Sequence, residues 1–211
     1  MVTWSSGGIL GTSIVRVFDI AVGMTGMTET AARAAGYDVE VLHNIKPDHS
    51  EYLGGKQLTI KAVADRDTSR LLGAQVIGPQ GVDKRVDVLA PAITHGATVG
   101  DLFHLDQAYA PPYATTKDPV HYTGMALDGA NNGHAPHITP AELIARVAAG
   151  ETWQVVDVRS APDHAKGHAD GAVNIPLKEL RGRVGELDPT LPTVTYCNKG
   201  TTGNAGQNVL R

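Results

Sequence analysis

The spacing of apolar residues divides the chain into two halves with different secondary-structure patterns. In the first half, residues 37–42 and 58–63 alternate between apolar and polar side chains, which is typical of half-buried strands. The segment 71–77 follows the second of these strands after a polar turn at 65–70, so we expect the two strands to pair as a hairpin. Further strands are predicted at 13–18 and 20–24, and helices at 29–35, 82–95 and 119–127. This half is therefore predicted to be an α+β domain with an antiparallel sheet.

The second half alternates short apolar strands with helical segments. Strands are predicted at 155–158, 172–175 and 193–196, and helices at 161–166, 177–184 and 203–211. Strands and helices that alternate at this spacing favour an α/β fold with a parallel sheet. The last predicted helix runs to the end of the sequence, where such a sheet usually continues. We therefore expect this domain to be incomplete at its C-terminus.

A segment without apolar periodicity, residues 128–138, separates the halves and is rich in glycine and asparagine. Directly after it, Thr139, Pro140 and Glu142 form a helix-start signal, with threonine as the N-cap and proline at the first helical position. We predict a first domain at 10–127, a linker at 128–138 and a second domain at 139–211.

Composition and charge narrow the classes of function. The formal net charge of −4 argues against a general electrostatic binder of nucleic acid. No apolar run approaches the roughly 20 residues that span a bilayer, so we expect no membrane partner. A single cysteine, Cys197, excludes an internal disulfide and favours a reducing, cytoplasmic setting. The nine histidines show no metal-ligand spacing, so no metal site is predicted.

Cys197 directly follows a predicted strand, and a glycine-containing loop and a helix follow it. Reversal of the chain at this point directs backbone N–H groups inward, and the helix adds the positive end of its dipole. Both effects lower the pKa of a thiol below the ~8.5 of free cysteine and stabilise an anionic persulfide. Lys199 is placed to add positive charge for an anionic sulfur donor. From the loop alone, an inert apolar cysteine at a strand end fits equally well.

Three segments in the second half decide between these interpretations. They are Val156-Asp157-Val158-Arg159, the stretch from Gly167 to Pro176, and Tyr196-Cys197 with its loop. In order and spacing they resemble the signature segments of the rhodanese family. The resemblance implies that Cys197 cycles between thiolate and persulfide. It further implies a substrate loop formed by Asn198, Lys199, Gly200, Thr201 and Thr202, with Asp157, Arg159 and His168 in support of the loop.

The sequence departs from the family pattern at two positions of this site. Thr202 stands where many members have an arginine, so the charge of the donor would be recognised by backbone amides and by Lys199. His164 replaces an aromatic residue that often precedes the Gly-His motif. A phosphatase is the related alternative. Its longer loop ends in an arginine that binds phosphate through two hydrogen bonds, and this loop contains no arginine, so a phosphatase is excluded.

The first half contains three further diagnostic segments, which are residues 10–19, residues 81–89, and residues 108–113 with 117–119. They resemble the C-terminal dimerisation domain of FAD-dependent pyridine nucleotide-disulfide oxidoreductases, in particular coenzyme A-disulfide reductases, including forms fused to a rhodanese domain. The resemblance implies a homodimer in which Tyr109 and, with a weaker match, Tyr52 face the disulfide substrate of the partner. A tyrosine that stiffens the neighbouring Pro-Pro loop explains Tyr109 equally well. For Lys84 and Arg85, a solvated helix face is favoured over contact with a CoA phosphate.

The chain lacks the glycine fingerprint of a dinucleotide-binding fold and the redox cysteine of the flavin domain. We therefore predict no cofactor in this chain, whereas FAD, NAD(P)H and CoA are implied for the full-length enzyme. The favoured function is a sulfurtransferase module on the scaffold of a CoA-disulfide or CoA-persulfide reductase. Its small-molecule partners would be CoA persulfide, thiosulfate or a low-molecular-weight thiol. The alternatives are a non-catalytic dimerisation and docking fragment and, least favoured, a complete flavoenzyme.

Overall fold

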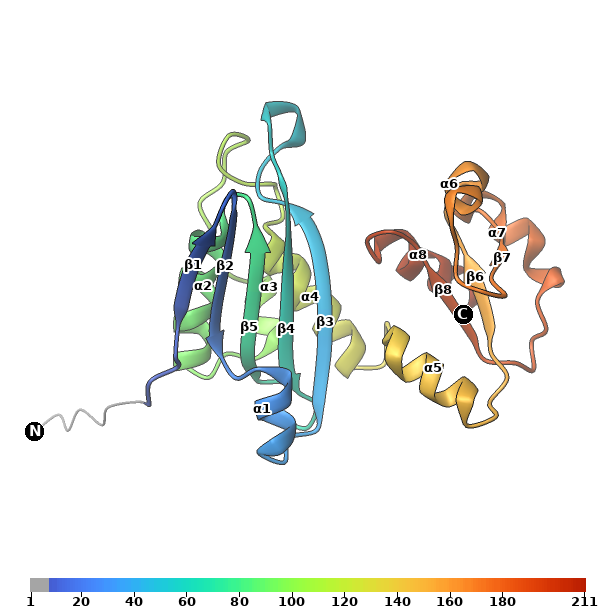
Figure 1. Cartoon of the computed structure of the whole chain (residues 1–211), viewed down its shortest axis with the longest axis horizontal. Coiled ribbons are helices and arrows are strands. Elements are labelled where there is room, and N and C mark those ends of the chain that lie inside the picture. Colours follow the sequence, from blue (N-terminus) through green and yellow to red (C-terminus); the bar gives the residue numbers. More distant parts are fainter. Residues whose placement is uncertain (1–7) are drawn as a thin grey trace, which may run out of the picture. The chain divides into compact units, whose positions relative to one another are not determined.

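A computed structural model describes residues 8–211 and divides the chain between His134 and Ala135 into two compact units (Figure 1). The first unit contains an antiparallel sheet with helices, and the second contains a parallel sheet with helices. The fold class predicted from the sequence is therefore confirmed for both halves. No helix within residues 8–211 has the length and apolar character needed to cross a membrane.

The sheet of the first unit has five strands. They are β1 (Ser13–Val17), β2 (Ile20–Gly26), β3 (Val39–Pro47), β4 (Gln57–Asp65) and β5 (Leu71–Gly78). Their order across the sheet is β1-β2-β5-β4-β3, and every neighbouring pair is antiparallel. The predicted hairpin is present, because β4 and β5 pair directly, with Ile60 opposite Val76. Strand β2 joins the hairpin at its other edge through a long-range pairing.

One face of this sheet is covered by the helices α2 (Val82–Thr94) and α4 (Pro119–Asn131), which lie behind it in Figure 1. Leu58 and Ile60 of β4 pack against Leu89 of α2 and Leu127 of α4, and all four side chains are fully buried or nearly so. The shorter elements of this unit are α1 (Glu29–Ala34), α3 (Val99–Phe103) and the 3-10 turn η1 (Glu51–Leu53). Helix α3, which the apolar pattern missed, begins at a capping box between Thr98 and Asp101.

Helix α4 is longer than the sequence pattern indicated. It continues to Asn131, so the first four residues of the predicted linker at 128–138 are helical. Leu127 is buried in the core, and the side-chain amide of Asn131 donates to the hydroxyl of Ser69 at 3.3 Å. These tertiary contacts hold the last turn in place despite its glycine and asparagine residues.

Arg85 of α2 is buried, with only 1% of its surface exposed. Its guanidinium donates to both carboxylate oxygens of Asp118, through Nε at 3.2 Å and Nη2 at 2.6 Å. It also donates to the backbone carbonyls of Asp48 at 2.6 Å and Gly81 at 3.2 Å. The expectation of a solvated helix face at Lys84 and Arg85 is therefore wrong for Arg85. The helical pattern around Arg85 cannot show that a carboxylate distant in sequence will neutralise the charge of the guanidinium.

The parallel sheet of the second unit has the order β7-β6-β8, with β6 (Gln154–Asp157) between β7 (Val173–Asn174) and β8 (Thr193–Tyr196). Its helical elements are α5 (Pro140–Ala148), α6 (Ala161–Lys166), α7 (Leu177–Arg183), the 3-10 turn η2 (Val184–Glu186) and α8 (Thr201–Leu210). The helix-start signal is confirmed, because Thr139 and Glu142 cap α5 reciprocally. The core consists of Val156, Val158, Ile175 and Leu180.

Replacement of Arg85 by alanine is expected to destabilise the first unit by about 3–5 kcal/mol, because it leaves the buried Asp118 carboxylate without its counter-charge. The free energy of unfolding from urea denaturation, followed by circular dichroism, measures the effect. Hydrogen exchange in residues 82–94 localises it. The matched control is Asp87→Ala on the exposed side of the same helix, which should change stability by about 0.5 kcal/mol at most. Equal effects of the two substitutions would contradict a central role for the buried pair.

Candidate active site

Cys197 lies immediately after β8 and is partly buried. Its Sγ accepts a hydrogen bond from the backbone N–H of Gly203 at 3.2 Å, and the backbone amides of Lys199, Gly200 and Thr202 also lower the pKa of the thiol. Gly200 has a φ of 84°, a left-handed conformation that suits glycine and turns the loop back toward the sulfur. Gly203 lies so close to β8 that a Cβ there would be 3.3 Å from the carbonyl oxygen of Thr195. The loop thus closes around the sulfur through backbone groups.

Two opposing effects determine the acidity of this thiol. Burial raises the pKa of Cys197, whereas the hydrogen bonds from the amides of Lys199, Gly203, Gly200 and Thr202 lower it. The hydrogen bonds prevail, so the pKa of Cys197 lies below its ordinary value, in the direction that the sequence predicted. Because the thiolate is the nucleophilic form of cysteine, this loop favours reactivity over an inert structural role.

Asp157, the last residue of β6, has a fully buried side chain behind the loop. Its carboxylate accepts hydrogen bonds from Arg159 Nε at 2.9 Å and Nη2 at 2.6 Å. His164 Nδ1 and the hydroxyl of Tyr196 each donate to it at 3.0 Å. Burial raises the pKa of Asp157, but the hydrogen bonds from Arg159, His164 and Tyr196 outweigh it and hold that pKa well below its usual range. The carboxylate is therefore a fixed negative charge.

Arg159 connects this carboxylate to the cysteine loop. Its Nη1 donates to the side-chain oxygen of Asn198 at 3.2 Å, and Nη2 donates to the carbonyl of Gly167 at 2.7 Å. The guanidinium also lies over the ring of Tyr196, with its Cζ 5.4 Å from the ring centroid. Since Asn198 follows Cys197 directly, Arg159 holds the first residue of the loop. These contacts join Asp157 and Arg159 to the loop, and the bracing role expected for both residues stays a prediction.

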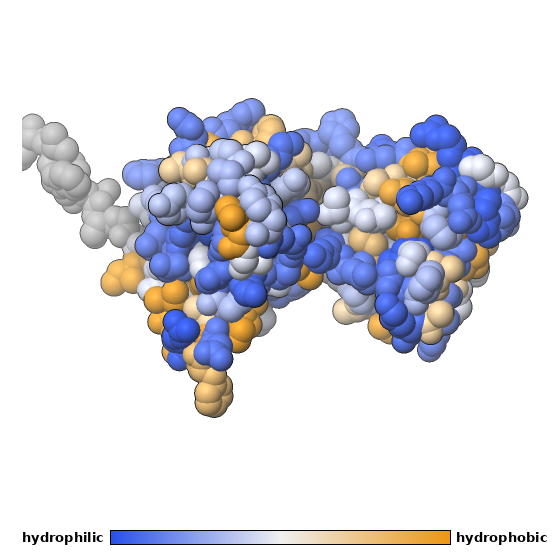
Figure 2. Space-filling model, turned by 90° about the horizontal axis from the view of Figure 1, so that it is seen from above, coloured by the Kyte–Doolittle hydropathy of each residue, from blue (hydrophilic) through white to orange (hydrophobic). Residues whose placement is uncertain are grey.

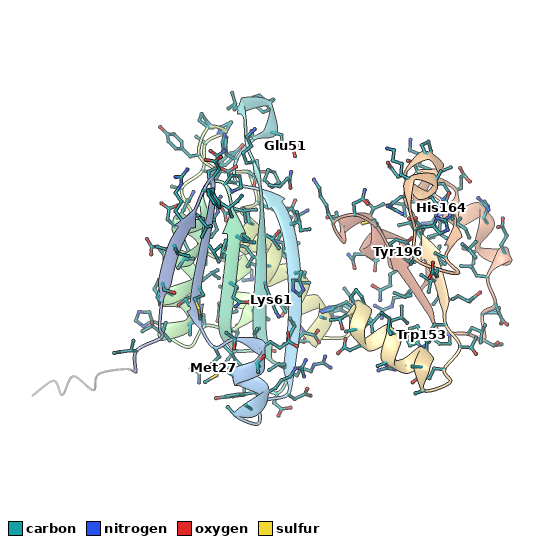
Figure 3. The ribbon with its side chains drawn as sticks, in the orientation of Figure 1. Met27, Glu51, Lys61, Trp153, His164 and Tyr196 are labelled. Carbon is teal, nitrogen blue, oxygen red and sulfur yellow. The ribbon has the colours of Figure 1, made fainter. Side chains whose placement is uncertain are left out.

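His168 contacts this network through His164. The two imidazole rings are stacked, with centroids 3.8 Å apart, and His168 Nδ1 donates to the carbonyl of His164 at 3.0 Å. In the sequence, His164 stands out only as a departure from a family pattern, and Tyr196 shows no sign of a role. Figure 3 shows His164 and Tyr196 in the second unit, where both side chains reach Asp157.

A further supporting residue missed in the sequence is Asn174 of β7. Its side-chain amide donates to the backbone carbonyls of Asp157 at 2.9 Å and Arg159 at 3.1 Å. The pairing of β6 with β7 places Asn174 directly opposite Asp157. Asn174 lies inside the second diagnostic segment, but its partners become apparent only once the register of the two strands is known.

An open cleft of about 690 Å³ lies over Cys197. It is lined by residues between 158 and 163, by residues 176–179 and by the loop residues Cys197, Asn198, Lys199, Thr201 and Thr202. A small molecule can therefore reach the thiol from solvent. Within the described part of the chain, no group of three or more histidine, cysteine, aspartate or glutamate side chains is placed to bind a metal.

The tyrosines singled out in the first half lie at one end of the first unit. Tyr52 belongs to η1, between β3 and β4, and Tyr109 lies in the loop that precedes α4. The backbone N–H of Ser50 donates to the carbonyl of Pro111 at 3.3 Å and so joins the two loops, which extend together in Figure 1. Both side chains are solvent-exposed, Tyr52 to 78% and Tyr109 to 49%. They belong to a different unit from Cys197.

Comparison with family sequence models gives one match in each unit. The model described as the pyridine nucleotide-disulphide oxidoreductase dimerisation domain matches residues 12–119. The model described as the rhodanese-like domain matches residues 139–211. The two matches have the order that the sequence analysis predicted.

Curated relatives resemble part of the chain. A CoA-dependent NAD(P)H sulfur oxidoreductase of Pyrococcus furiosus is 44% identical over 116 residues, which are 54% of this chain and 26% of that protein. A coenzyme A disulfide reductase of Staphylococcus epidermidis is 36% identical over 118 residues, which are 56% of this chain and 26% of that protein. The chain thus spans about a quarter of the length of these relatives.

Two solved structures resemble nearly all of the chain. Reduced CoADR-RHD from Bacillus anthracis has a TM-score of 0.90 and 35% sequence identity, covering 95% of this chain and 36% of its own. An NAD-dependent persulfide reductase from A. fulgidus has a TM-score of 0.84 and 30% identity, covering 96% of this chain and 36% of its own. These likenesses extend across both units.

The depressed pKa of Asp157 predicts a pH dependence of stability. Its contribution is fully present above the ordinary value of 3.8 and is lost as the pH falls toward the lower pKa of the folded state. Asp157→Asn should therefore flatten the acid loss of stability below pH 3.8, besides destabilising the second unit by about 3 kcal/mol at neutral pH. Urea denaturation followed by Trp153 fluorescence in a Trp4→Phe background measures both effects. Asp170→Asn, on the surface, is the control; a wild-type acid profile in Asp157→Asn would contradict the prediction.

The thiolate character of Cys197 predicts its rate of alkylation. In the folded protein, the pH midpoint for reaction with iodoacetamide should lie below the ~8.5 of a free cysteine, because amide N–H groups stabilise the thiolate. The reaction is followed by the mass of the alkylated protein over time. The same titration in guanidinium chloride serves as the control and should return the midpoint to ~8.5, since the loop is then lost. Identical midpoints in both conditions would show that the loop does not activate the thiol.

Proposed function

We propose that this chain, which belongs to the pyridine nucleotide-disulphide oxidoreductase dimerisation-domain family and continues into a rhodanese-like domain, carries sulfane sulfur as a persulfide on Cys197. The observation that carries the proposal is the closure of the loop around its sulfur, where the N–H of Gly203 donates to Sγ at 3.2 Å and the backbone amides of Lys199, Gly200 and Thr202 also lower the pKa of the thiol. Donors in this arrangement stabilise a thiolate before transfer and a persulfide anion after it.

Loading proceeds by one displacement. The Cys197 thiolate attacks the sulfane sulfur of a donor and forms a new S–S bond, while the bond between that sulfur and its carrier breaks. The carrier leaves with the bonding electron pair, as a thiolate or, from thiosulfate, as sulfite. The amides that lower the pKa of Cys197 favour its thiolate form, and attack by that form requires no general base. Charge is conserved and no further oxidant or reductant takes part.

Unloading reverses the roles of the two sulfurs. An acceptor thiolate attacks the outer sulfur of the persulfide, and Cys197 leaves as a thiolate. The amides stabilise the leaving group in this step as they stabilise the nucleophile in the first. Arg159 keeps the loop in position through Asn198, and the N-terminal end of α8 adds its positive dipole near the sulfur. The loop therefore serves both half-reactions without rearrangement.

The first unit is proposed to be the homodimerisation scaffold of a cytoplasmic CoA-disulfide or CoA-persulfide reductase, whose FAD and NAD(P)H would be bound outside this chain. All five residues of β1 are exposed, although Ile14, Val15 and Val17 are apolar, and Phe18 in the following turn is 93% exposed. Figure 2 shows apolar side chains at the surface of this unit. Contiguous exposed apolar surface of this kind marks a protein contact. Tyr52 and Tyr109 would face the disulfide site of the partner.

The sulfur-carrier function predicts the mass of the protein after exposure to thiosulfate. Wild-type protein should gain one sulfur atom, which a thiol reductant removes, whereas Cys197→Ser should gain none because the attacking sulfur is absent. Intact-mass spectrometry measures the gain, and circular dichroism of Cys197→Ser shows that its fold is kept.

Transfer of sulfur by folded Cys197→Ser would contradict the role of this cysteine. A folded wild-type protein that never gains sulfur, from thiosulfate or from an organic persulfide, would instead favour the non-catalytic docking fragment.

A further inference from the structure

Helix α8 packs closely against β8, the strand that leads to Cys197 (Figure 1). The two buried residues of the helix, Gly203 and Gly206, are three positions apart and therefore share one face. A Cβ at Gly203 would be 3.3 Å from the carbonyl oxygen of Thr195, and a Cβ at Gly206 would be 3.4 Å from Thr195 Cβ. The two glycines thus allow the helix to pack directly on Thr195.

The N-terminal end of α8 uses the sulfur of Cys197 as an acceptor. The N–H groups in the first turn of a helix have no acceptor within the helix itself. Gly200, which precedes α8, provides no side-chain cap, and the N–H of Gly203 donates instead to Cys197 Sγ at 3.2 Å. Because a hydrogen bond weakens with distance and misalignment, the position of Gly203 determines how well its N–H stabilises the sulfur.

Thr195 holds the same glycine through its other backbone group. The hydroxyl of Thr195 donates to the carbonyl oxygen of Gly203 at 2.7 Å. Gly203 is therefore bonded to β8 through its carbonyl and to the sulfur of Cys197 through its N–H. Strand propensity explains a β-branched side chain at position 195 but not its hydroxyl, since valine suits a strand equally well. The hydroxyl is explained by its contact with α8.

We infer that Thr195 is a positioning residue of the sulfur site, whose hydroxyl holds Gly203 against β8 and so keeps the N–H of Gly203 within hydrogen-bond distance of the Cys197 sulfur. This inference rests on the proposed function of Cys197 and adds a residue to it. Thr195 lies outside the cleft, so it acts on the sulfur through Gly203. Loss of the hydroxyl leaves the thiolate less stabilised and lowers the fraction of Cys197 in the reactive form at a given pH.

The substitution Thr195→Val tests the inference, because it removes the hydroxyl and keeps the size and branching of the side chain. In the full chain, it should raise the pH midpoint for alkylation of Cys197 by iodoacetamide by about half a unit, as expected for a weakened hydrogen bond to the thiolate. Loading of sulfur from thiosulfate should fall about threefold at a pH below both midpoints and reach the wild-type rate above them, where the thiol is ionised in both proteins.

Two further variants separate the hydroxyl from other effects of substitution. Thr195→Ser keeps the hydroxyl and should retain the wild-type midpoint and loading rate. Thr193→Val is the matched control, since it removes a hydroxyl two residues earlier on the same face of β8. That hydroxyl accepts from Gln154 Nε2 at 3.0 Å and donates to the carbonyl of Leu191 at 3.4 Å, both outside α8, so the midpoint should not change.

Charges in the cleft stay constant throughout this comparison. The ionisable side chains that line the cleft are those of Arg159, Asp163, Lys178, Glu179 and Lys199. All three variants retain these groups and replace one neutral side chain by another. A difference in midpoint between them therefore reports the hydrogen bonds to the sulfur, and circular dichroism shows that each variant keeps its fold.

A wild-type midpoint in folded Thr195→Val would overturn the positioning role. Equal rises in Thr195→Val and Thr195→Ser, or in Thr195→Val and Thr193→Val, would overturn it as well, because the hydroxyl of Thr195 would then not be the cause. Alkylation needs no sulfur donor, so these outcomes decide on Thr195 even where no sulfur is transferred. Failure of the wild-type protein to load from thiosulfate and from an organic persulfide would instead overturn the proposed function of Cys197.

Discussion

The buried carboxylate of Asp157 is the constraint on which the sulfur site depends. An ionised group without solvent is costly unless donors surround it, and here β6 supplies the charge while Arg159, His164 and Tyr196 supply the donors. The hydrogen bonds to this carboxylate thus fix α6 through His164 and the end of β8 through Tyr196. They also fix the side chain of Arg159, which holds Asn198. The position of Cys197 follows, because it lies between Tyr196 and Asn198. The ion pair thus positions the residues on either side of Cys197, while the backbone amides of the loop lower the pKa of the thiol.

A buried ion pair has a comparable effect in the first unit. Arg85 joins α2 to Asp118, which caps the start of α4, and to the carbonyl of Asp48 at the base of the β3–β4 connection. A buried pair of this kind adds little net stability compared with well-packed apolar side chains. What it does here is to fix the loops that carry Tyr52 and Tyr109 relative to the helices behind the sheet. Both units therefore use a buried charge to position exposed loops.

The sequence predicted those features that depend on neighbouring residues. The alternation at 58–63 and 71–77 and the turn between them produce the β4–β5 hairpin, and Thr139 caps α5 through an interaction three residues away. The strand order of the five-stranded sheet was not predictable, because β2 joins β5 across half of the unit. The burial of Arg85 and the convergence of His164 and Tyr196 on Asp157 were missed for the same reason. Their partners are distant in sequence, and an isolated arginine, histidine or tyrosine carries no local signal of burial.

The features of the candidate site also fall into two groups, those that depend on neighbouring residues and those that depend on the assembled fold. Backbone amides surround the sulfur, so its reactivity depends on the length of the loop, on the left-handed conformation of Gly200 and on the close approach of Gly203 to β8. Each of these features can be recognised from neighbouring residues in the sequence. A backbone amide responds to negative charge but does not distinguish one carrier of sulfur from another. That distinction requires side chains at the rim of the cleft, to which the first turn of α7 and the cysteine loop both contribute. Reactivity can therefore be recognised from a short motif, whereas selectivity depends on the assembled sheet.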